Sequence, residues 1–149
     1  MRRMLLCSAF LIIASSAPSR ADSPPPYLFS IGNTTRVSQM VQTPDGRILA
    51  PSQDGGLINV YSEFGTFINS FGLGSDQPTG IALDDSSNIY VAEQHSHLIA
   101  KYSPFFVLIK KWGVYGPGPG QLEYPTTLPF SPAPSKLYVP NFLAGHVPA

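Results

Sequence analysis

The sequence predicts an all-β protein: an incomplete β-propeller of four-stranded antiparallel blades, with two full blades plus parts of a third. The first observation is an internal repeat, because residues 47–72 (RILAPSQDGGLINVYSEFGTFINSFG) align without a gap to residues 88–113 (NIYVAEQHSHLIAKYSPFFVLIKKWG) at an offset of 41 residues. The second is that each repeat consists of short β-rich runs separated by turn residues. A period of about forty residues filled with short strands is typical of propeller blades.

The second repeat, residues 78–113, shows its strands most clearly. They are expected at residues 79–83 (TGIAL), 88–92 (NIYVA), 97–102 (HLIAKY) and 105–112 (FFVLIKKW). The segment DDSS at residues 84–87 is expected to turn the chain between the first two, because Asp and Ser side chains bond nearby backbone groups. Four antiparallel strands in about forty residues make one blade.

The first repeat, residues 37–72, predicts the same order of elements. Its strands are expected at residues 37–42, 47–50, 57–61 and 67–71. Pro44, Asp45 and Gly46 predict the first turn, because proline presets φ and glycine permits a positive φ.

The third repeat, residues 125–149, is expected to be partial. Residues 125–128 (PTTL) align with the first strand of the second repeat, residues 136–139 (KLYV) with its second strand, and residues 145–147 (GHV) with the start of its third. Residues 131–135 (SPAPS) predict a turn. Pro129, Pro132 and Pro134 are expected to break the first strand, because proline cannot donate to a ladder.

The N-terminus, residues 1–21, is expected to be a secretory signal peptide. Arg2 and Arg3 precede an apolar run at residues 4–14, and Ser19 and Ala21 suit a cleavage site before Asp22. The run is shorter than the roughly 20 apolar residues that a membrane-spanning helix needs. Residues 22–36 would then hold a linker and a leading strand, residues 27–32 (YLFSIG). We expect a secreted or periplasmic protein with no membrane anchor after cleavage.

Charge and cysteine content exclude several classes of function. Cleavage would remove three of the 9 basic residues and leave 6 against 9 acidic ones, a net charge of −3. A chain without a basic stripe is not expected to bind nucleic acid. Cys7 is the only cysteine and lies in the leader, so the mature chain would have neither disulfides nor cysteine chemistry.

Residues 77–102 (QPTGIALDDSSNIYVAEQHSHLIAKY) resemble an NHL repeat, a family named for an Asn-His-Leu triplet that here is Ser96-His97-Leu98. Residues 116–125 (GPGPGQLEYP) resemble the segment between repeats of that family. The first repeat departs from the triplet with Gly55-Gly56-Leu57. The resemblance covers residues 37 to about 147. It implies a propeller that mostly serves as a binding platform, with ligands at one end of the central axis.

His95 and His97 are weak candidate metal ligands, two residues apart at the start of a strand, where alternation points both to one face. Such a pair can bind a metal ion. The sequence offers no third ligand, and the resemblance implies a structural role for His97. We therefore expect no metal site and no cofactor.

The adjacent carboxylates of Asp84 and Asp85 suit either acid–base chemistry and calcium binding or a turn, and their place after a strand favours the turn. No catalytic residue is predicted.

The favoured function is a non-catalytic binding or interaction module, with an unknown protein, peptide or glycan as its ligand. One alternative is a truncated fragment of a larger propeller without independent function. Another is a fragment of a metal-dependent propeller lyase, because the resemblance extends to secreted lyases that act on peptidyl hydroxyglycine. Their site needs ligands from several blades, and the only histidines here are His95, His97 and His146. Since propellers typically have about 4–8 blades, two copies could close a ring by self-association, and the favoured competing outcome is an aggregation-prone fragment.

Overall fold

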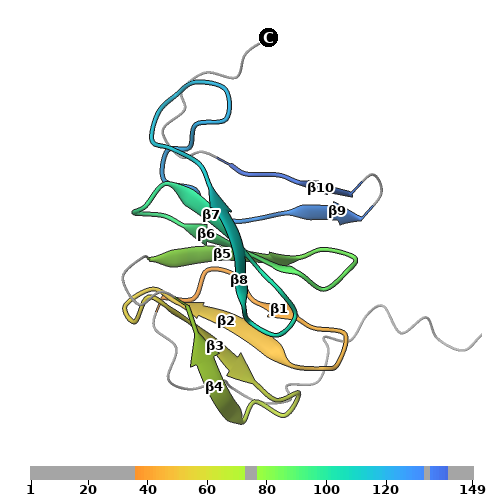
Figure 1. Cartoon of the computed structure of the whole chain (residues 1–149). Coiled ribbons are helices and arrows are strands. Elements are labelled where there is room, and N and C mark those ends of the chain that lie inside the picture. Colours follow the sequence, from red (N-terminus) through yellow and green to blue (C-terminus); the bar gives the residue numbers. More distant parts are fainter. Residues whose placement is uncertain (1–35, 73–76, 133–134, 141–149) are drawn as a thin grey trace, which may run out of the picture.

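The computed structural model describes residues 36–72, 77–132 and 135–140. The strands in these segments form two four-stranded antiparallel sheets and one two-stranded sheet (Figure 1). Within the same segments no helix is long and apolar enough to cross a membrane. The expected signal peptide, the leading strand at residues 27–32 and residues 145–147 lie outside the described residues.

Each four-stranded sheet is one blade, with its strands in sequence order. The first blade contains β1 (Val41–Gln42), β2 (Ile48–Ser52), β3 (Leu57–Tyr61) and β4 (Phe67–Phe71). The second contains β5 (Pro78–Leu83), β6 (Ile89–Glu93), β7 (Leu98–Tyr102) and β8 (Leu108–Trp112). The last three strands of the second blade begin and end 41 residues after those of the first, so the sequence repeat is a structural repeat.

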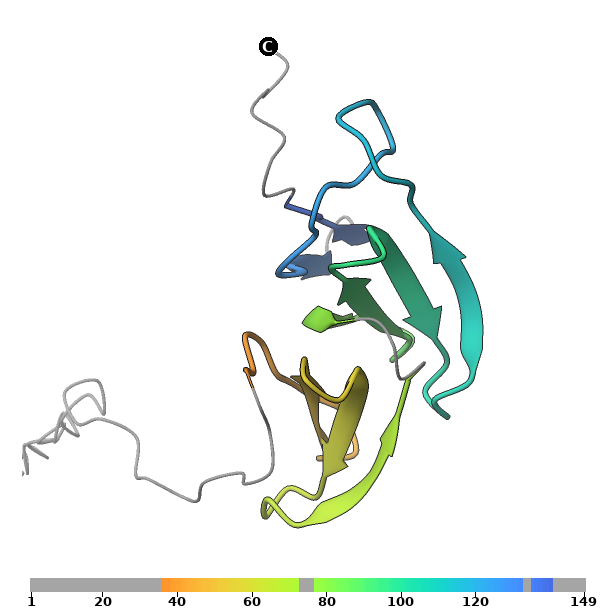
Figure 2. The same ribbon diagram turned by 90° about the vertical axis from the view of Figure 1, so that its left-hand side faces the viewer.

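A third unit follows, the hairpin of β9 (Phe130–Pro132) and β10 (Ser135–Leu137). Figure 2 shows the two blades and the hairpin stacked one after another, with the first strands on one side and the outer strands β4 and β8 on the other. This is the arrangement of neighbouring propeller blades. The described residues therefore form an arc of a β-propeller.

The apolar core lies between the units rather than within one sheet. One cluster fills the space between the first and second blades, with Leu49, Ile58 and Val60 on one side and Ile81, Ile89, Val91, Ala100 and Tyr102 on the other. A second cluster joins the second blade to the third unit through Ala82, Ala92, Ile99, Leu122 and Leu128. Because a single sheet cannot bury its own faces, each blade depends on its neighbour for most of its apolar burial.

The first strand of the first blade is shorter than the sequence predicts. A strand over residues 37–42 was expected, but β1 covers only Val41–Gln42. The preceding residues bond through their side chains instead. Gln39 Oε1 accepts the backbone N–H of Ile81 at 3.2 Å and that of Leu128 at 3.0 Å, and the Ser38 hydroxyl bonds the carbonyl of Thr79. A side-chain amide thus links all three units near the inner edge.

The third unit also departs from the expected register. Residues 125–128 form no strand, because their backbone carbonyls are used elsewhere: the Thr79 hydroxyl lies 2.9 Å from the carbonyl of Pro125 and 3.2 Å from that of Thr126. The first strand starts later, at Phe130, and runs into Pro132. Pro132, expected to break the strand, instead belongs to β9 and pairs with Ser135 across the hairpin. Of the turn expected at residues 131–135, residues 131, 132 and 135 lie in strands, and residues 133–134 lie outside the described residues.

Candidate inter-blade site

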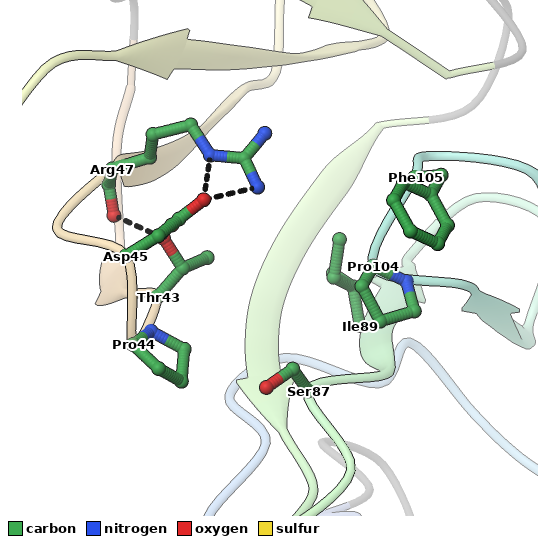
Figure 3. A pocket seen from close by; sticks show the side chains of 8 residues that line it. All are labelled: Thr43, Pro44, Asp45, Arg47, Ser87, Ile89, Pro104 and Phe105. Atoms are coloured by element: carbon green, nitrogen blue, oxygen red, sulfur yellow. Dashed lines mark hydrogen bonds and ion pairs between the residues drawn. The ribbon is translucent and has the colours of Figure 1, made fainter.

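A pocket of about 230 Å³ lies between the first and second blades, where the β1–β2, β5–β6 and β7–β8 turns meet (Figure 3). We call it the inter-blade pocket, and it is lined by Thr43, Pro44, Asp45, Arg47, Ser87, Ile89, Pro104 and Phe105. The first blade supplies its charged side chains, whereas the second supplies apolar groups and one hydroxyl. The wall of the pocket on the first blade is therefore charged, and the wall on the second blade is mostly apolar.

Arg47 is held in one orientation by two contacts. Its Nε and Nη2 both lie 2.8 Å from Asp45 Oδ2, and its guanidinium carbon lies 4.9 Å from the centre of the Phe106 ring. Phe106 in turn stacks on Phe71 with ring centres 4.5 Å apart. The rest of the guanidinium edge has no partner among the described residues, and Figure 3 shows the group turned towards the wall formed by Ile89 and Phe105.

Asp45 remains ionised at neutral pH. The hydrogen bond from Arg47, followed by that from the Thr43 hydroxyl 2.5 Å away, lowers the pKa of Asp45 to about 2. The side chain is more than half exposed, so water screens much of its charge. A carboxylate with so low a pKa is a weak base near pH 7, and this limits its use in general acid–base catalysis.

Phe105 stands at the tip of the β7–β8 turn with 84% of its surface exposed. Ser103 positions this turn, because its Oγ accepts the backbone N–H groups of Phe105 and Val107 at 3.3 and 3.2 Å. The first blade repeats this geometry 41 residues earlier, where Ser62 bonds the N–H of Phe64. Phe64 is also exposed, but it does not line the pocket.

Three turns of the second blade carry side chains at backbone positions that favour glycine. Ser87, His97 and Phe106 have φ values of 62°, 55° and 66°. Each stands 41 residues after a glycine of the first blade that is also left-handed, namely Gly46, Gly56 and Gly65. A left-handed conformation costs a non-glycine residue about 1–2 kcal/mol. Ser87 lines the pocket and Phe106 supports Arg47, so two of the three strained residues belong to this site.

The two histidines singled out by the sequence lie away from the pocket. His97 Nδ1 accepts the backbone N–H of Tyr124 at 3.1 Å, and its ring centre lies 4.7 Å from the rings of Tyr115 and Tyr124. His97 thus ties the loop after β8 to the β6–β7 turn. His95 is exposed. Among the described residues, no three His, Cys, Asp or Glu side chains are grouped to hold a metal ion. His146 lies outside the described residues.

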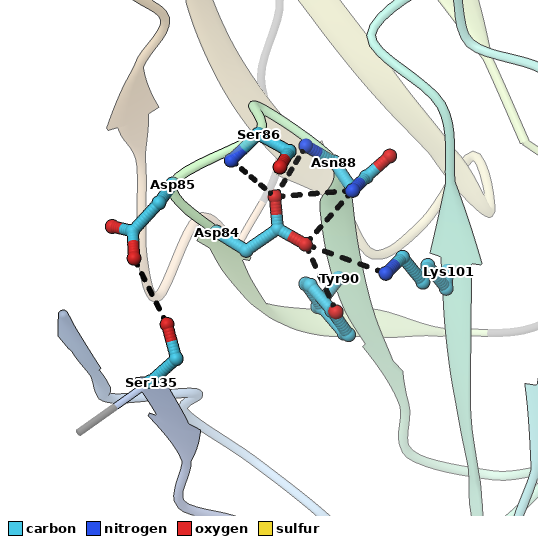
Figure 4. A network of polar contacts seen from close by, with 7 residues as sticks. All are labelled: Asp84, Asp85, Ser86, Asn88, Tyr90, Lys101 and Ser135. Atoms are coloured by element: carbon cyan, nitrogen blue, oxygen red, sulfur yellow. Dashed lines mark hydrogen bonds and ion pairs between the residues drawn. The ribbon is translucent and has the colours of Figure 1, made fainter. Parts of the chain in front are cut away.

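Asp84 and Asp85 lie in the same turn between β5 and β6 but point in different directions and bond different units (Figure 4). Asp84 Oδ1 accepts the backbone N–H groups of Ser86 and Asn88, both at 2.9 Å. Its Oδ2 accepts the Asn88 amide at 2.8 Å and the Tyr90 hydroxyl at 3.1 Å, with Lys101 Nζ at 3.3 Å. Asp85 instead accepts the Ser135 hydroxyl of the third unit at 2.9 Å. The predicted turn role of Asp84 is confirmed.

The bonds around Asp84 determine its ionisation. Burial, the largest single influence, would raise the pKa of this carboxyl. The hydrogen bonds from Asn88, Tyr90 and Lys101 together outweigh burial and hold the pKa below its usual value. The carboxylate is therefore fully committed to the fold.

A second cleft of about 370 Å³ lies along the inner strands. It is lined by Gln39, Val41, Gln42, Ile81, Ala82, Leu83, Leu128, Pro129 and Phe130. Its polar side chains already hold backbone, since Gln39 bonds two N–H groups and Gln42 Nε2 donates to the carbonyl of Gly46 at 3.2 Å.

Sequence reasoning missed the residues of the inter-blade pocket. Arg47 occupies the repeat position of Asn88, and this departure was the available signal. The ion pair of Lys111 with Glu93 was also not predicted from the sequence. The Lys111 ammonium lies 2.5 Å from Glu93 Oε2, and the side chain of Glu93 is only 4% exposed. Lys111, on β8, thus neutralises a buried carboxylate on β6, across the intervening strand β7.

Comparisons with known proteins agree with the fold. A model of a β-propeller repeat family matches residues 63–92, which run from the β3–β4 turn of the first blade into β6 of the second. No curated protein matches the chain. A catalytically inactive virginiamycin B lyase from Staphylococcus aureus with quinupristin is similar at 16% identity and a TM-score of 0.52, over 67% of this chain and 33% of that one. A streptogramin B lyase is similar at 15% identity and a TM-score of 0.54, over 73% of this chain and 41% of that one.

These findings establish a β-propeller repeat protein. A selenomethionine-substituted virginiamycin B lyase from Staphylococcus aureus is similar at 12% identity with a TM-score of 0.54. The chain covers between 33% and 42% of the length of these structures. At such identities the likeness concerns the fold, and the activity of the lyases does not transfer with it.

Proposed function

We propose that this chain is an exported, NHL-type propeller module that binds a ligand without transforming it. The inter-blade pocket is the proposed binding site. The observation that carries the proposal is the orientation of Arg47, whose guanidinium is fixed by Asp45 and Phe106 with an unused edge beside apolar walls. A few placed polar groups within an apolar lining are typical of ligand sites.

The chemistry of the pocket favours binding over catalysis. Asp45 is its only carboxylate, and the low pKa set by Arg47 makes it a poor base near neutral pH. Its charge is also committed to orienting Arg47. The NHL assignment has separate support, because His97, at the triplet position, bonds the loop after β8 in the structural role that the resemblance implies.

The proposal is tested by nuclear magnetic resonance of the isotope-labelled chain with a panel of small probes, including N-acetylated amino acids and monosaccharides. A probe that binds should shift the backbone amides of Thr43, of residues 45–47 and of residues 87–89, and it should be recovered unchanged after prolonged incubation. Phe105→Ala should weaken binding, because it removes an apolar wall of the pocket.

The matched control is Phe64→Ala, which truncates the equivalent ring of the first blade outside the pocket. It should leave probe binding unchanged. Shifts confined to the inner cleft, around Gln39 and Ile81, would move the binding site elsewhere, and conversion of a probe would contradict the non-catalytic assignment.

A further inference from the structure

The free edge of Arg47 indicates what kind of group the inter-blade pocket takes. Both contacts to Asp45 end on one carboxylate oxygen, Oδ2, so they occupy one side of the guanidinium. The other side retains N–H donors that have no partner among the described residues. A guanidinium edge presents two parallel donors, which match the two oxygens of a carboxylate.

The remaining walls define the body of the ligand. Pro44, Ile89, Pro104 and Phe105 present apolar surface, and at about 230 Å³ the pocket lies just below the range of roughly 300–1,000 Å³ common for whole small-molecule sites. This volume suits one apolar side chain rather than an extended ligand. The Ser87 hydroxyl has no side-chain partner among the described residues and offers a further hydrogen bond at the wall opposite Arg47.

Charge selects among the anions that a guanidinium binds. Asp45 is ionised beside Arg47, so the pair carries no net charge. The negative charge of Asp45 repels a doubly charged phosphate more than a singly charged carboxylate. The strained backbone of Ser87 and Phe106 adds a second line of support. Non-glycine residues kept at left-handed positions are concentrated at functional sites, and both of these residues border the pocket or support its arginine.

We infer that the inter-blade pocket binds an apolar group carrying a free carboxylate, as at the C-terminal residue of a peptide with an apolar side chain. Arg47 pairs with the carboxylate, and the apolar walls take the side chain. Ser87 bonds the adjoining polar backbone. This inference rests on the proposed binding function and specifies the ligand of that same pocket.

Three probes test the inference by resonance titration of the full chain: N-acetylphenylalanine, its carboxamide and 3-phenylpropionate. The carboxylate of N-acetylphenylalanine should bind at least about tenfold more tightly than the carboxamide, as expected for a hydrogen bond to a charged group. The third probe distinguishes a peptide C-terminus from a simple apolar acid, because 3-phenylpropionate has the carboxylate and the ring but no peptide group. If it binds as tightly as N-acetylphenylalanine, a free aryl or alkyl acid is sufficient. If it binds more weakly, the ligand is a peptide terminus.

Variants locate the preference on Arg47. Arg47→Gln should remove the preference for carboxylate over carboxamide, and Lys110→Gln, which neutralises an exposed lysine outside the pocket, should retain it. Asp45→Asn should strengthen carboxylate binding, because it removes the negative charge beside Arg47. This second variant still tests the inference if Arg47→Gln fails to fold. If carboxylate and carboxamide shift the pocket amides with equal affinity, the carboxylate inference is wrong while the binding function stands. If no probe shifts these amides, the binding function itself fails.

Discussion

At the scale of single residues, several polar side chains accept hydrogen bonds from backbone N–H groups. Gln39 bonds two N–H groups of neighbouring units, and Asp84 bonds two N–H groups of its own turn. Ser62 and Ser103 do the same in equivalent turns of the two blades. Such bonds satisfy donors that a strand ladder leaves unpaired. The identical serines of the repeat are therefore explained by turn geometry.

Asp84 gives the chain an acid-sensitive element. Because the folded pKa of this carboxyl is depressed, its stabilisation is present above the unfolded pKa of about 3.9 and is lost as the pH falls through the lower folded value. Asp84→Asn should cost roughly 1–3 kcal/mol at pH 7, through the disrupted bonds to Asn88 and Lys101. It should also flatten the loss of stability below about pH 4. Urea unfolding monitored across pH measures both effects.

Asp85→Asn is the control for this experiment, because its carboxylate accepts a single bond from the exposed Ser135 hydroxyl. It should change the acid dependence less than Asp84→Asn does. An Asp84→Asn curve parallel to that of the unmodified chain at every pH would contradict the assigned role.

At the scale of elements, close backbone contact joins the second blade to the third unit. A Cβ added at Gly80 on β5 would lie 2.0 Å from the carbonyl oxygen of Thr126 and 3.0 Å from the backbone N of Leu128. Neither backbone atom can move without displacing the segment that leads into β9. The same approach lets the Thr79 hydroxyl reach the carbonyls of Pro125 and Thr126.

Gly80→Ala should therefore separate the third unit from the second blade. Overpacking of this kind typically costs about 1–3 kcal/mol, and a clash with backbone is expected at or above the upper end. The fluorescence of Trp112, the only tryptophan, reports on this side of the second blade, where its ring meets Tyr90. Gly55→Ala is the control, because its added Cβ would meet only Ser52 Oγ, at 3.7 Å. Equal stability of the two variants would rule out the close contact.

At the scale of the whole molecule, the described residues form an arc rather than a ring. Within those residues β10 pairs on one side only, with β9, and an open strand edge favours pairing with another chain. The two apolar clusters cross unit boundaries, so loss of one blade removes core from the next. Propellers typically close with about 4–8 blades, more than this arc contains.

We predict that the purified chain self-associates, because a second copy can cover the open edge in a symmetric contact. Light scattering over a range of concentrations should give a discrete dimer, and deletion of residues 27–32, expected to complete the last blade of the partner, should dissociate it. Non-specific aggregation would show that the arc lacks a complementary surface. A soluble, folded monomer would contradict the prediction of closure.

The sequence by itself determined the repeat, the four-stranded blade and the turns. The repeat is visible as a period of 41 residues, and each turn depends on the chemistry of a few adjacent residues. Strands β2 to β4 and β6 to β8 follow that period closely. The tertiary structure decided the rest. It shortened β1, because the side chain of Gln39 bonds backbone groups of the other units. It delayed β9, because the backbone carbonyls of Pro125 and Thr126 bond the Thr79 hydroxyl. It also assembled the inter-blade pocket, since Arg47 and Phe105 lie far apart in sequence and meet only when two blades pack.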